Sequence, residues 1–271
     1  MTTDTSVAVG ARAGIGAISG VGAHVDARTG TGIAARTGTG TDTRTDTHAD
    51  THANTTLAVP AYFHPRTDPA AWARLAALGP ALRFAVMNPD SGPGTAPDPA
   101  YHPVIRAVCA AGGRLTGYVD TDYGRRPSGA VLRDVAAYRS WYGLTGVFFD
   151  QVPSAARHLA HYRRLVAGAR RGGFDFVVMN PGVTPSPGFA DLADVLVTFE
   201  GEWSTYGDYP VAEWIRGLPR ERFCHLIHGA GPEALAAARA RAAANHVGVL
   251  YATELTGSNP WAALCAELLD A

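Results

Sequence analysis

Two acidic residues in this sequence each follow a run of bulky apolar residues. Asp150 ends Val-Phe-Phe-Asp at 147–150, and Glu200 ends Val-Thr-Phe-Glu at 197–200. A charged carboxylate beside an apolar core is costly unless a partner or the opening of a site receives it. Cleavage of a glycosidic bond requires two carboxyls, one to protonate the leaving oxygen and one to attack or to activate water. Asp150 and Glu200 are therefore the candidate catalytic pair.

Polar and aromatic residues recur at the ends of the other apolar runs, whereas arginine is rare there. Aromatic rings pack on the C–H faces of sugars, and carboxylate or amide groups bind hydroxyls, so this mixture favours a carbohydrate. The expected stacking surfaces are Tyr62, Tyr118, Tyr123, Trp203 and Tyr251. The expected polar contacts to substrate are His64, Asn88, Asp90, Asp120, Asp122, Gln151, Asn180, His228 and Glu254.

Several of these residues also have structural interpretations. An acid at the end of a strand often caps the following turn, although Ser154 could fill that role after Asp150. Asp120 and Asp122 fit loop caps in the same way. The tetrapeptide Val-Met-Asn-Pro occurs at 86–89 and again at 178–181. Asparagine before proline is held extended and starts a turn as readily as it contacts a substrate.

Three histidines raise the question of a metal site. Metal-dependent barrel hydrolases usually carry His-x-His on the first strand, but Tyr62-Phe63-His64 supplies one imidazole. His225 and His228 lie together in Arg-Phe-Cys-His-Leu-Ile-His. We expect neither a metal nor a cofactor, and a metal hydrolase remains the alternative that a chelator would test.

The elements that must position these side chains alternate regularly along the chain. Short apolar runs, most of them continuous as in strands covered on both faces, are separated by Ala/Leu/Arg segments of helical period. The predicted strands are 57–63, 82–87, 114–119, 146–149, 175–179, 194–199, 222–227 and 246–251. A last helix is predicted to open at Asn259-Pro260, with Trp261, Leu264, Cys265 and Leu268 on one face.

Eight strand–helix pairs within residues 57–271 predict a closed (β/α)8 barrel, a TIM barrel of the α/β class. In such a barrel the carboxyl ends of all strands meet at one mouth, which would bring Asp150 and Glu200 together. An open doubly wound sheet is the alternative. It usually carries a nucleotide-binding glycine loop, and no G-x-G-x-x-G follows the first run.

Composition limits the remaining possibilities. Residues 1–56 are rich in Thr, Gly, Ala, Asp and Arg, with a dipeptide repeat at 37–48, so we predict a disordered leader there. The formal net charge of -1 gives no attraction to nucleic acid or to an anionic membrane. No signal peptide is evident in the sequence as written. We expect a monomer whose partner is a polysaccharide.

Ordered motifs at the predicted strand ends resemble spherulation-specific family 4, the spherulin-4-like proteins. The segments that carry the resemblance are PAYFHP (60–65), VMNPDSGPG (86–94), GYVDTDYGRRP (117–127), WYGLTGVFFDQVP (141–153), VVMNPG (177–182), VTFEGEW (197–203) and YATELTGSNPW (251–261). The resemblance implies a (β/α)8 glycoside hydrolase related to cofactor-free microbial enzymes that cleave α-1,4-linked galactosamine or N-acetylgalactosamine exopolysaccharides. It also implies a secreted or cell-surface location.

By position, the resemblance places the acid after the fourth strand on Asp150 and the acid after the sixth on Glu200. Better-known catalytic members show Asp-Glu after the fourth strand, whereas this chain has Asp150-Gln151. Glutamine cannot titrate. If the second acid of this pair is the proton donor in the family's reaction, this chain would be a non-catalytic carbohydrate-binding barrel. If Asp150 and Glu200 suffice, the glutamine only tunes orientation.

Overall fold

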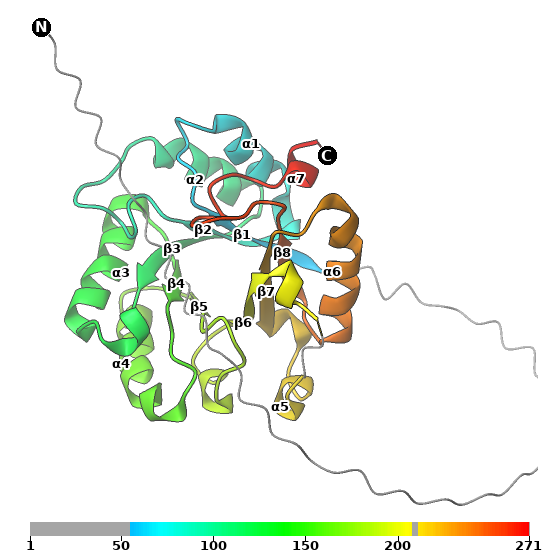
Figure 1. Cartoon of the computed structure of the whole chain (residues 1–271). Coiled ribbons are helices and arrows are strands. Elements are labelled where there is room, and N and C mark those ends of the chain that lie inside the picture. Colours follow the sequence, from blue (N-terminus) through cyan, green and yellow to red (C-terminus); the bar gives the residue numbers. More distant parts are fainter. Residues whose placement is uncertain (1–54, 208–210, 271) are drawn as a thin grey trace, which may run out of the picture.

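The computed structural model describes residues 55–207 and 211–270, and within them eight parallel strands close into a barrel in sequence order. Figure 1 shows the strands at the centre and the helices around them. β1 pairs with both β2 and β8, which confirms the predicted closed barrel. The strands are β1 (Thr56–Ala61), β2 (Leu82–Met87), β3 (Leu115–Asp120), β4 (Gly146–Asp150), β5 (Phe176–Met179), β6 (Val195–Glu202), β7 (Phe223–His228) and β8 (Val249–Ala252).

The helices on the outside of the barrel vary in length. They are α1 (Pro69–Ala77), α2 (Tyr101–Ala110), α3 (Ser128–Tyr142), α4 (Leu159–Arg171), α5 (Glu213–Arg216), α6 (Pro232–Ala244) and α7 (Ala266–Asp270). The connection from β5 to β6 contains a 3₁₀ turn, Pro187–Phe189, instead of an α-helix. Three prolines and two glycines between residues 181 and 188 explain this departure from regular alternation, because both residue types disfavour helix interiors.

The prediction of a helix opening at Asn259-Pro260 is wrong, since α7 begins only at Ala266. The apolar residues of the predicted stripe are nevertheless buried. Tertiary contacts occupy this segment: the Cys265 N–H donates to the Tyr251 hydroxyl at 3.0 Å, and the Asn259 side chain caps the Trp261 N–H at 3.2 Å. A buried irregular turn therefore shows the apolar spacing of an amphipathic helix.

Aromatic side chains fill part of the barrel interior. Phe84 from β2 contacts Phe148 from β4 and Phe176 from β5, with ring centroids 6.4 and 5.9 Å apart. β2 is a neighbour of neither β4 nor β5, so the rings meet inside the barrel. A packed interior of this kind makes the barrel a rigid support for side chains at its mouth.

The described part of the chain bears on the predicted leader and on the question of membrane-spanning helices. Of the leader predicted at 1–56, only Thr55 and Thr56 are described, and Thr56 already begins β1. The rest of that prediction lies outside the described residues. None of the helices in residues 55–207 and 211–270 has both the length and the apolar character to cross a bilayer.

Candidate active site

The two predicted acids lie together at the carboxyl ends of the strands. Asp150 is the last residue of β4, and Glu200 lies near the end of β6. Between them is Asn180, just after β5, whose Nδ2 donates to Asp150 Oδ1 at 2.7 Å and also to Glu200 Oε2. Two hydrogen bonds from one nitrogen, each about 3 Å long or shorter, keep the two acceptor oxygens within about 6 Å of each other.

Each of the four carboxyl oxygens of this pair accepts a hydrogen bond. The Tyr118 hydroxyl donates to Asp150 Oδ2 at 2.8 Å, and Trp261 Nε1 donates to Glu200 Oε1 at 3.2 Å. Sequence analysis missed Trp261 because its apolar spacing assigned it to a helix face. Its position shortly after the eighth strand was the available signal, since residues in that connection lie at the mouth.

Burial shapes the electrostatics of the pair. Burial and the charge of Asp150 raise the pKa of Glu200 to about 7, against the lowering effect of the Asn180 and Trp261 hydrogen bonds. Burial also raises the pKa of Asp150, while hydrogen bonds from Tyr118, from the Gln151 backbone and from Asn180 lower it. At neutral pH the Glu200 carboxyl is therefore partly protonated, and its neighbour Asp150 is one cause of that.

The backbone between β5 and β6 holds Asn180 and Glu200 in fixed relation. The Gly182 N–H donates to Asn180 Oδ1 at 3.0 Å, and the Gly182 carbonyl accepts from the Glu200 N–H at 3.0 Å. Gly182 has φ of +65°, a left-handed conformation that glycine adopts at little cost. In β6 the register to β7 shifts between Val197 and Phe199, an irregularity that sets which way the following residues point.

Tyrosines surround the two acids. Tyr62 and Tyr118 meet edge to face at 5.6 Å between ring centroids. Burial and then the charge of Asp150 raise the pKa of Tyr62 well above its usual value. Tyr123 is 40% exposed, and burial followed by the charges of Asp150 and Glu200 raises its pKa. The exposed ring of Tyr123 thus lies beside the pair and remains a candidate stacking surface.

Residues with left-handed backbone gather in the same region. Asp122, Tyr123 and Gln151 have φ of 45°, 52° and 52°. The Tyr123 N–H donates to the Gln151 carbonyl at 2.8 Å, which joins the loop after β3 to the end of β4. Non-glycine residues in this conformation cost about 1 kcal/mol or more each and are concentrated at functional sites.

The two aspartates after β3 have structural partners. Asp120 Oδ1 accepts from the Asp122 N–H at 2.7 Å, and Asp122 forms an ion pair with Arg125. Asp120 is also in register with Asp150, and its charge contributes to the raised pKa of that residue. Asp120 therefore lies next to the pair, while Asp122 serves the loop.

Four residues that were predicted to make polar contacts with substrate lie in hydrogen-bonded loops. His64 Nε2 lies 2.7 Å from an Asp98 carboxylate oxygen, and Asn88 Oδ1 accepts from the Gly92 N–H at 2.8 Å. Asp90 is exposed in the same turn, where its N–H donates to the Gly92 carbonyl. Glu254 Oε1 accepts from the Ala266 N–H at 3.0 Å at the start of α7. No hydrogen bond or ion pair among the described residues joins these four to Asp150 or Glu200.

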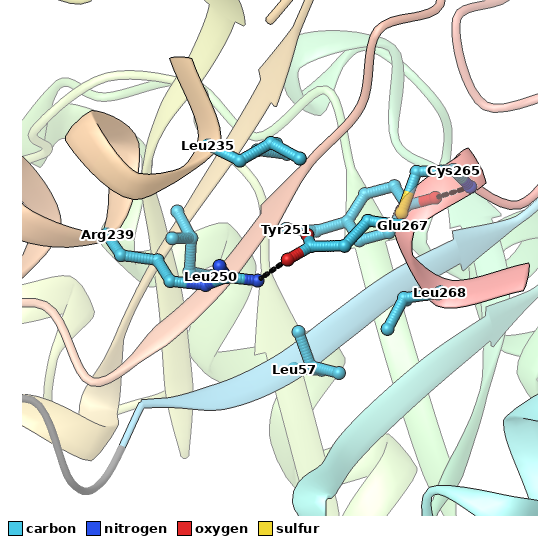
Figure 2. A pocket seen from close by; sticks show the side chains of 9 residues that line it. Leu57, Leu235, Arg239, Leu250, Tyr251, Cys265, Glu267 and Leu268 are labelled. Atoms are coloured by element: carbon cyan, nitrogen blue, oxygen red, sulfur yellow. Dashed lines mark hydrogen bonds and ion pairs between the residues drawn. The ribbon is translucent and has the colours of Figure 1, made fainter. Parts of the chain in front are cut away.

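The structure does not bring Tyr251 into the site. Its side chain is 1% exposed, and Figure 2 shows it reaching Cys265 close to the ion pair of Arg239 and Glu267. The cavity there has a volume of about 20 Å³, room for one water molecule but not for a sugar ring. Tyr251 is a packing residue between β8 and α7.

Trp203 directly follows β6, and His228 ends the neighbouring strand β7. The guanidinium carbon of Arg241 lies 4.5 Å from the Trp203 ring centroid, so one face of that ring is already covered. His228 is 8% exposed, and its ring meets the edge of Trp261 at 5.9 Å between centroids. Its Nδ1 has no hydrogen-bond partner within the described part of the chain. His228 contacts Trp261, which donates to Glu200, and it remains a candidate substrate contact.

The three histidines considered as metal ligands have separate surroundings. His225 Nδ1 lies 2.7 Å from the Tyr206 hydroxyl, and burial lowers the pKa of His225 to about 3. His64 pairs with Asp98, and His228 packs on Trp261. Residues 55–207 and 211–270 contain no group of three His, Cys, Asp or Glu side chains arranged to hold a metal ion.

Comparison with known proteins bears on the whole barrel. The family model described as spherulation-specific family 4 matches residues 56–270. Spherulin-4 of Physarum polycephalum is 33% identical over 169 residues, which are 60% of this chain and 49% of that protein. The chain thus spans about half the length of that curated relative. The crystal structure of Aspergillus clavatus Sph3 in complex with GalNAc superposes with a TM-score of 0.69 and 26% identity, covering 81% of this chain and 96% of that one.

The motifs at the strand ends predicted this family, and the comparisons confirm it over all eight strands. The chain belongs to spherulation-specific family 4.

Proposed function

We propose that the protein is a glycoside hydrolase that cleaves an amino-sugar polysaccharide in an endo-acting manner, with Asp150 and Glu200 as its catalytic pair. The observation that carries the proposal is the shared Asn180 amide, which holds the two carboxyls within reach of one bond. The likeness to Sph3, solved with GalNAc, supports a carbohydrate-active barrel. Retaining glycosidases have carboxyls about 5 to 5.5 Å apart, and inverting ones about 6.5 to 9.5 Å apart. The short separation here favours retention.

In the first step, Glu200 acts as the acid and Asp150 as the nucleophile. Glu200 gives its proton to the glycosidic oxygen while an Asp150 oxygen attacks the anomeric carbon. The bond from that carbon to the glycosidic oxygen breaks, and the leaving sugar departs as an alcohol. A pKa of about 7 suits Glu200 to this role, because a large fraction carries the proton at neutral pH.

In the second step, the roles of proton donor and acceptor reverse. The Glu200 carboxylate takes a proton from water as the water oxygen attacks the anomeric carbon. The bond to Asp150 breaks, which restores both carboxyls and leaves the product with its original anomeric configuration. Tyr118, hydrogen-bonded to Asp150 at 2.8 Å, holds this side chain in place through both steps.

The acidic, aromatic surroundings also favour an amino sugar as substrate. Asp120, Asp150 and Glu200 lie close together, and burial followed by their charges raises the pKa of the partly exposed Tyr123. Partly deacetylated galactosamine chains are cationic and would be drawn to these carboxyls, and salt would weaken that attraction. Family resemblance points to galactosamine and N-acetylgalactosamine polymers as the class to test first.

A non-catalytic carbohydrate-binding barrel is the second candidate, favoured by Gln151. This residue stands where better-known catalytic members have an acid, and its amide cannot supply a proton. Its left-handed backbone and its carbonyl, which accepts from the Tyr123 N–H, show that the position still shapes the mouth. The two candidates share a binding surface and differ only in bond cleavage.

One experiment separates them. The full chain is incubated with galactosaminogalactan, and released reducing ends are measured for the wild type, Asp150→Asn, Glu200→Gln and Gln151→Glu. Hydrolysis predicts release by the wild type, with a loss of at least about 1000-fold in the Asp150 and Glu200 variants. Gln151→Glu should change the rate by less than about tenfold.

Binding of the polymer without release by the wild type would support the carbohydrate-binding barrel instead. Release that appears only in Gln151→Glu would show that the missing acid is essential. Activity should be unchanged in EDTA, and a loss that zinc restores would favour a metal-dependent reaction.

A further inference from the structure

The side chain of Asn180 has all of its hydrogen-bonding groups engaged within the protein. Its two N–H donors go to Asp150 Oδ1 and Glu200 Oε2, and its Oδ1 accepts from the Gly182 N–H at 3.0 Å. A carboxamide has only two N–H donors, and this one is 6% exposed. Neither N–H is therefore left for a sugar hydroxyl, and binding of substrate does not explain the residue.

The backbone fixes Asn180 as firmly as its side chain. The Asn180 N–H donates to the Phe149 carbonyl at 2.8 Å, and the Asn180 carbonyl accepts from the Val152 N–H at 3.0 Å. These bonds tie it to the residues on both sides of Asp150. Pro181 follows and restricts the preceding backbone to an extended conformation. The amide cannot turn away from the acids without breaking these contacts.

We propose that Asn180 is a positioning residue that sets the separation of the two catalytic carboxyls; this inference rests on the proposed function. Two carboxylates at this distance repel each other strongly where water is scarce. A single nitrogen between them replaces part of that repulsion with two charge-assisted hydrogen bonds. Because both bonds are donated by one nitrogen atom, they limit the distance between the two carboxyls as well as lowering their repulsion.

No other group near the two acids within the described residues makes the same pair of hydrogen bonds as Asn180. The hydrogen bonds from Asn180 lower the pKa of both acids, against the effect of burial. The other ionisable groups coupled to the charges of the pair are Tyr62 just after β1, Tyr118 and Asp120 of β3, Tyr123 after β3, Tyr162 of α4, and Cys224 of β7. Tyr118 and Trp261 each donate to one acid only, so within the described residues Asn180 alone donates to both.

The chain contains a matched control for this residue. Asn88 stands in the same tetrapeptide, Val-Met-Asn-Pro, and also follows a barrel strand. Its Oδ1 accepts a backbone N–H, from Gly92 at 2.8 Å, just as Asn180 accepts one from Gly182. It makes no hydrogen bond to either acid. Replacing Asn88 therefore removes a similar turn contact without touching the pair.

The first measurement needs no activity. The Trp261 indole N–H donates to Glu200, so its ¹H–¹⁵N signal should report the ionisation of that residue. The full-length wild type, Asn180→Ala, Asn180→Asp and Asn88→Ala are titrated, with Trp261→Phe used to assign the signal. We expect a midpoint near 7 in the wild type. It should rise by about one pH unit in both Asn180 variants, and stay unchanged in Asn88→Ala.

The second measurement separates positioning from substrate binding. On a cleavable polymer, both Asn180 variants should lose about 10- to 100-fold in kcat with KM changed less than twofold, and their pH–rate profiles should move to higher pH. Asn180→Asp keeps the shape of the side chain, and melting curves show that each variant is folded. A raised KM with an unshifted indole midpoint would overturn the inference. A wild type without activity would contradict the proposed function, and the indole titration would still decide the role of Asn180.

Discussion

At Glu200 the needs of the reaction and of folding conflict. Its pKa of about 7 exceeds its usual value of 4.5 because the buried anion is disfavoured beside Asp150. The folded state therefore holds a proton that the unfolded state has released, and the stability of the fold decreases as pH rises from about 4.5 to about 7. Above that range the loss is complete and constant.

Glu200→Gln should remove this pH-dependent loss. The free energy of unfolding of the variant, relative to the wild type, should increase by about 1 to 3 kcal/mol between pH 4 and pH 8. Urea unfolding at several pH values measures it. The change with pH is the decisive quantity, because the amide also faces the donors of Asn180 and Trp261 with only one acceptor oxygen, a mismatch that does not depend on pH.

Glu202→Gln is the matched control, because Glu202 lies on the same strand and is exposed. Its replacement should give a difference that is nearly flat with pH. An equally flat result for Glu200→Gln would mean that folding does not raise the pKa of Glu200, and it would weaken the assignment of this residue as the acid.

Among the elements, the loop between β3 and α3 combines strain with exposure. Asp122, Tyr123 and Gly124 all have left-handed backbone, and Tyr123 alone presents a large exposed ring. A tyrosine is poorly suited to this conformation, whereas asparagine tolerates it. The strain is understandable if the ring is retained for contact with substrate.

Tyr123→Asn and Tyr123→Ala test this interpretation together. Both variants lose the ring and should raise KM for the polysaccharide by about 3- to 10-fold. The asparagine variant should be more stable than the alanine variant by about 0.5 to 1 kcal/mol, since it fits the left-handed backbone better. Tyr123→Phe should keep KM near that of the wild type. Unchanged KM in all three variants would remove Tyr123 from the substrate site.

The elements also show what sequence could and could not predict. Continuous apolar runs located the strands closely, with β2 found at 82–87 as predicted and β8 beginning at Val249, three residues later than predicted. Convergence of Asp150 and Glu200 followed from barrel closure. Trp261 was missed and the last helix misplaced because a buried turn and an amphipathic helix share one apolar spacing. The function of Asn180 depends on a hydrogen-bond network and a shift in strand register, which no local pattern encodes.

For the whole molecule, the described contacts predict that residues 55–271 suffice for folding. β1 begins at Thr56, whose N–H and hydroxyl both donate to the Gly248 carbonyl, and Arg220 reaches Thr55. A chain that begins at Thr55 should therefore melt within about 2 °C of the full chain, as followed by circular dichroism. Deletion through Ala61 removes β1 and opens the barrel, so it should abolish cooperative melting. A large loss of stability on removal of residues 1–54 alone would contradict the proposed domain boundary.

The pairing of β1 with β8 has a consequence for how the protein is made. The bond from Thr56 to Gly248 joins residues 192 positions apart in the chain. During synthesis the first strand therefore keeps one edge unpaired until residues 192 positions later in the chain have left the ribosome. Contacts between residues so far apart in the sequence slow folding, and the unpaired strand edge can meanwhile pair with other chains. We expect the yield of soluble protein to depend on translation speed and chaperone supply more than on any single side chain at the mouth.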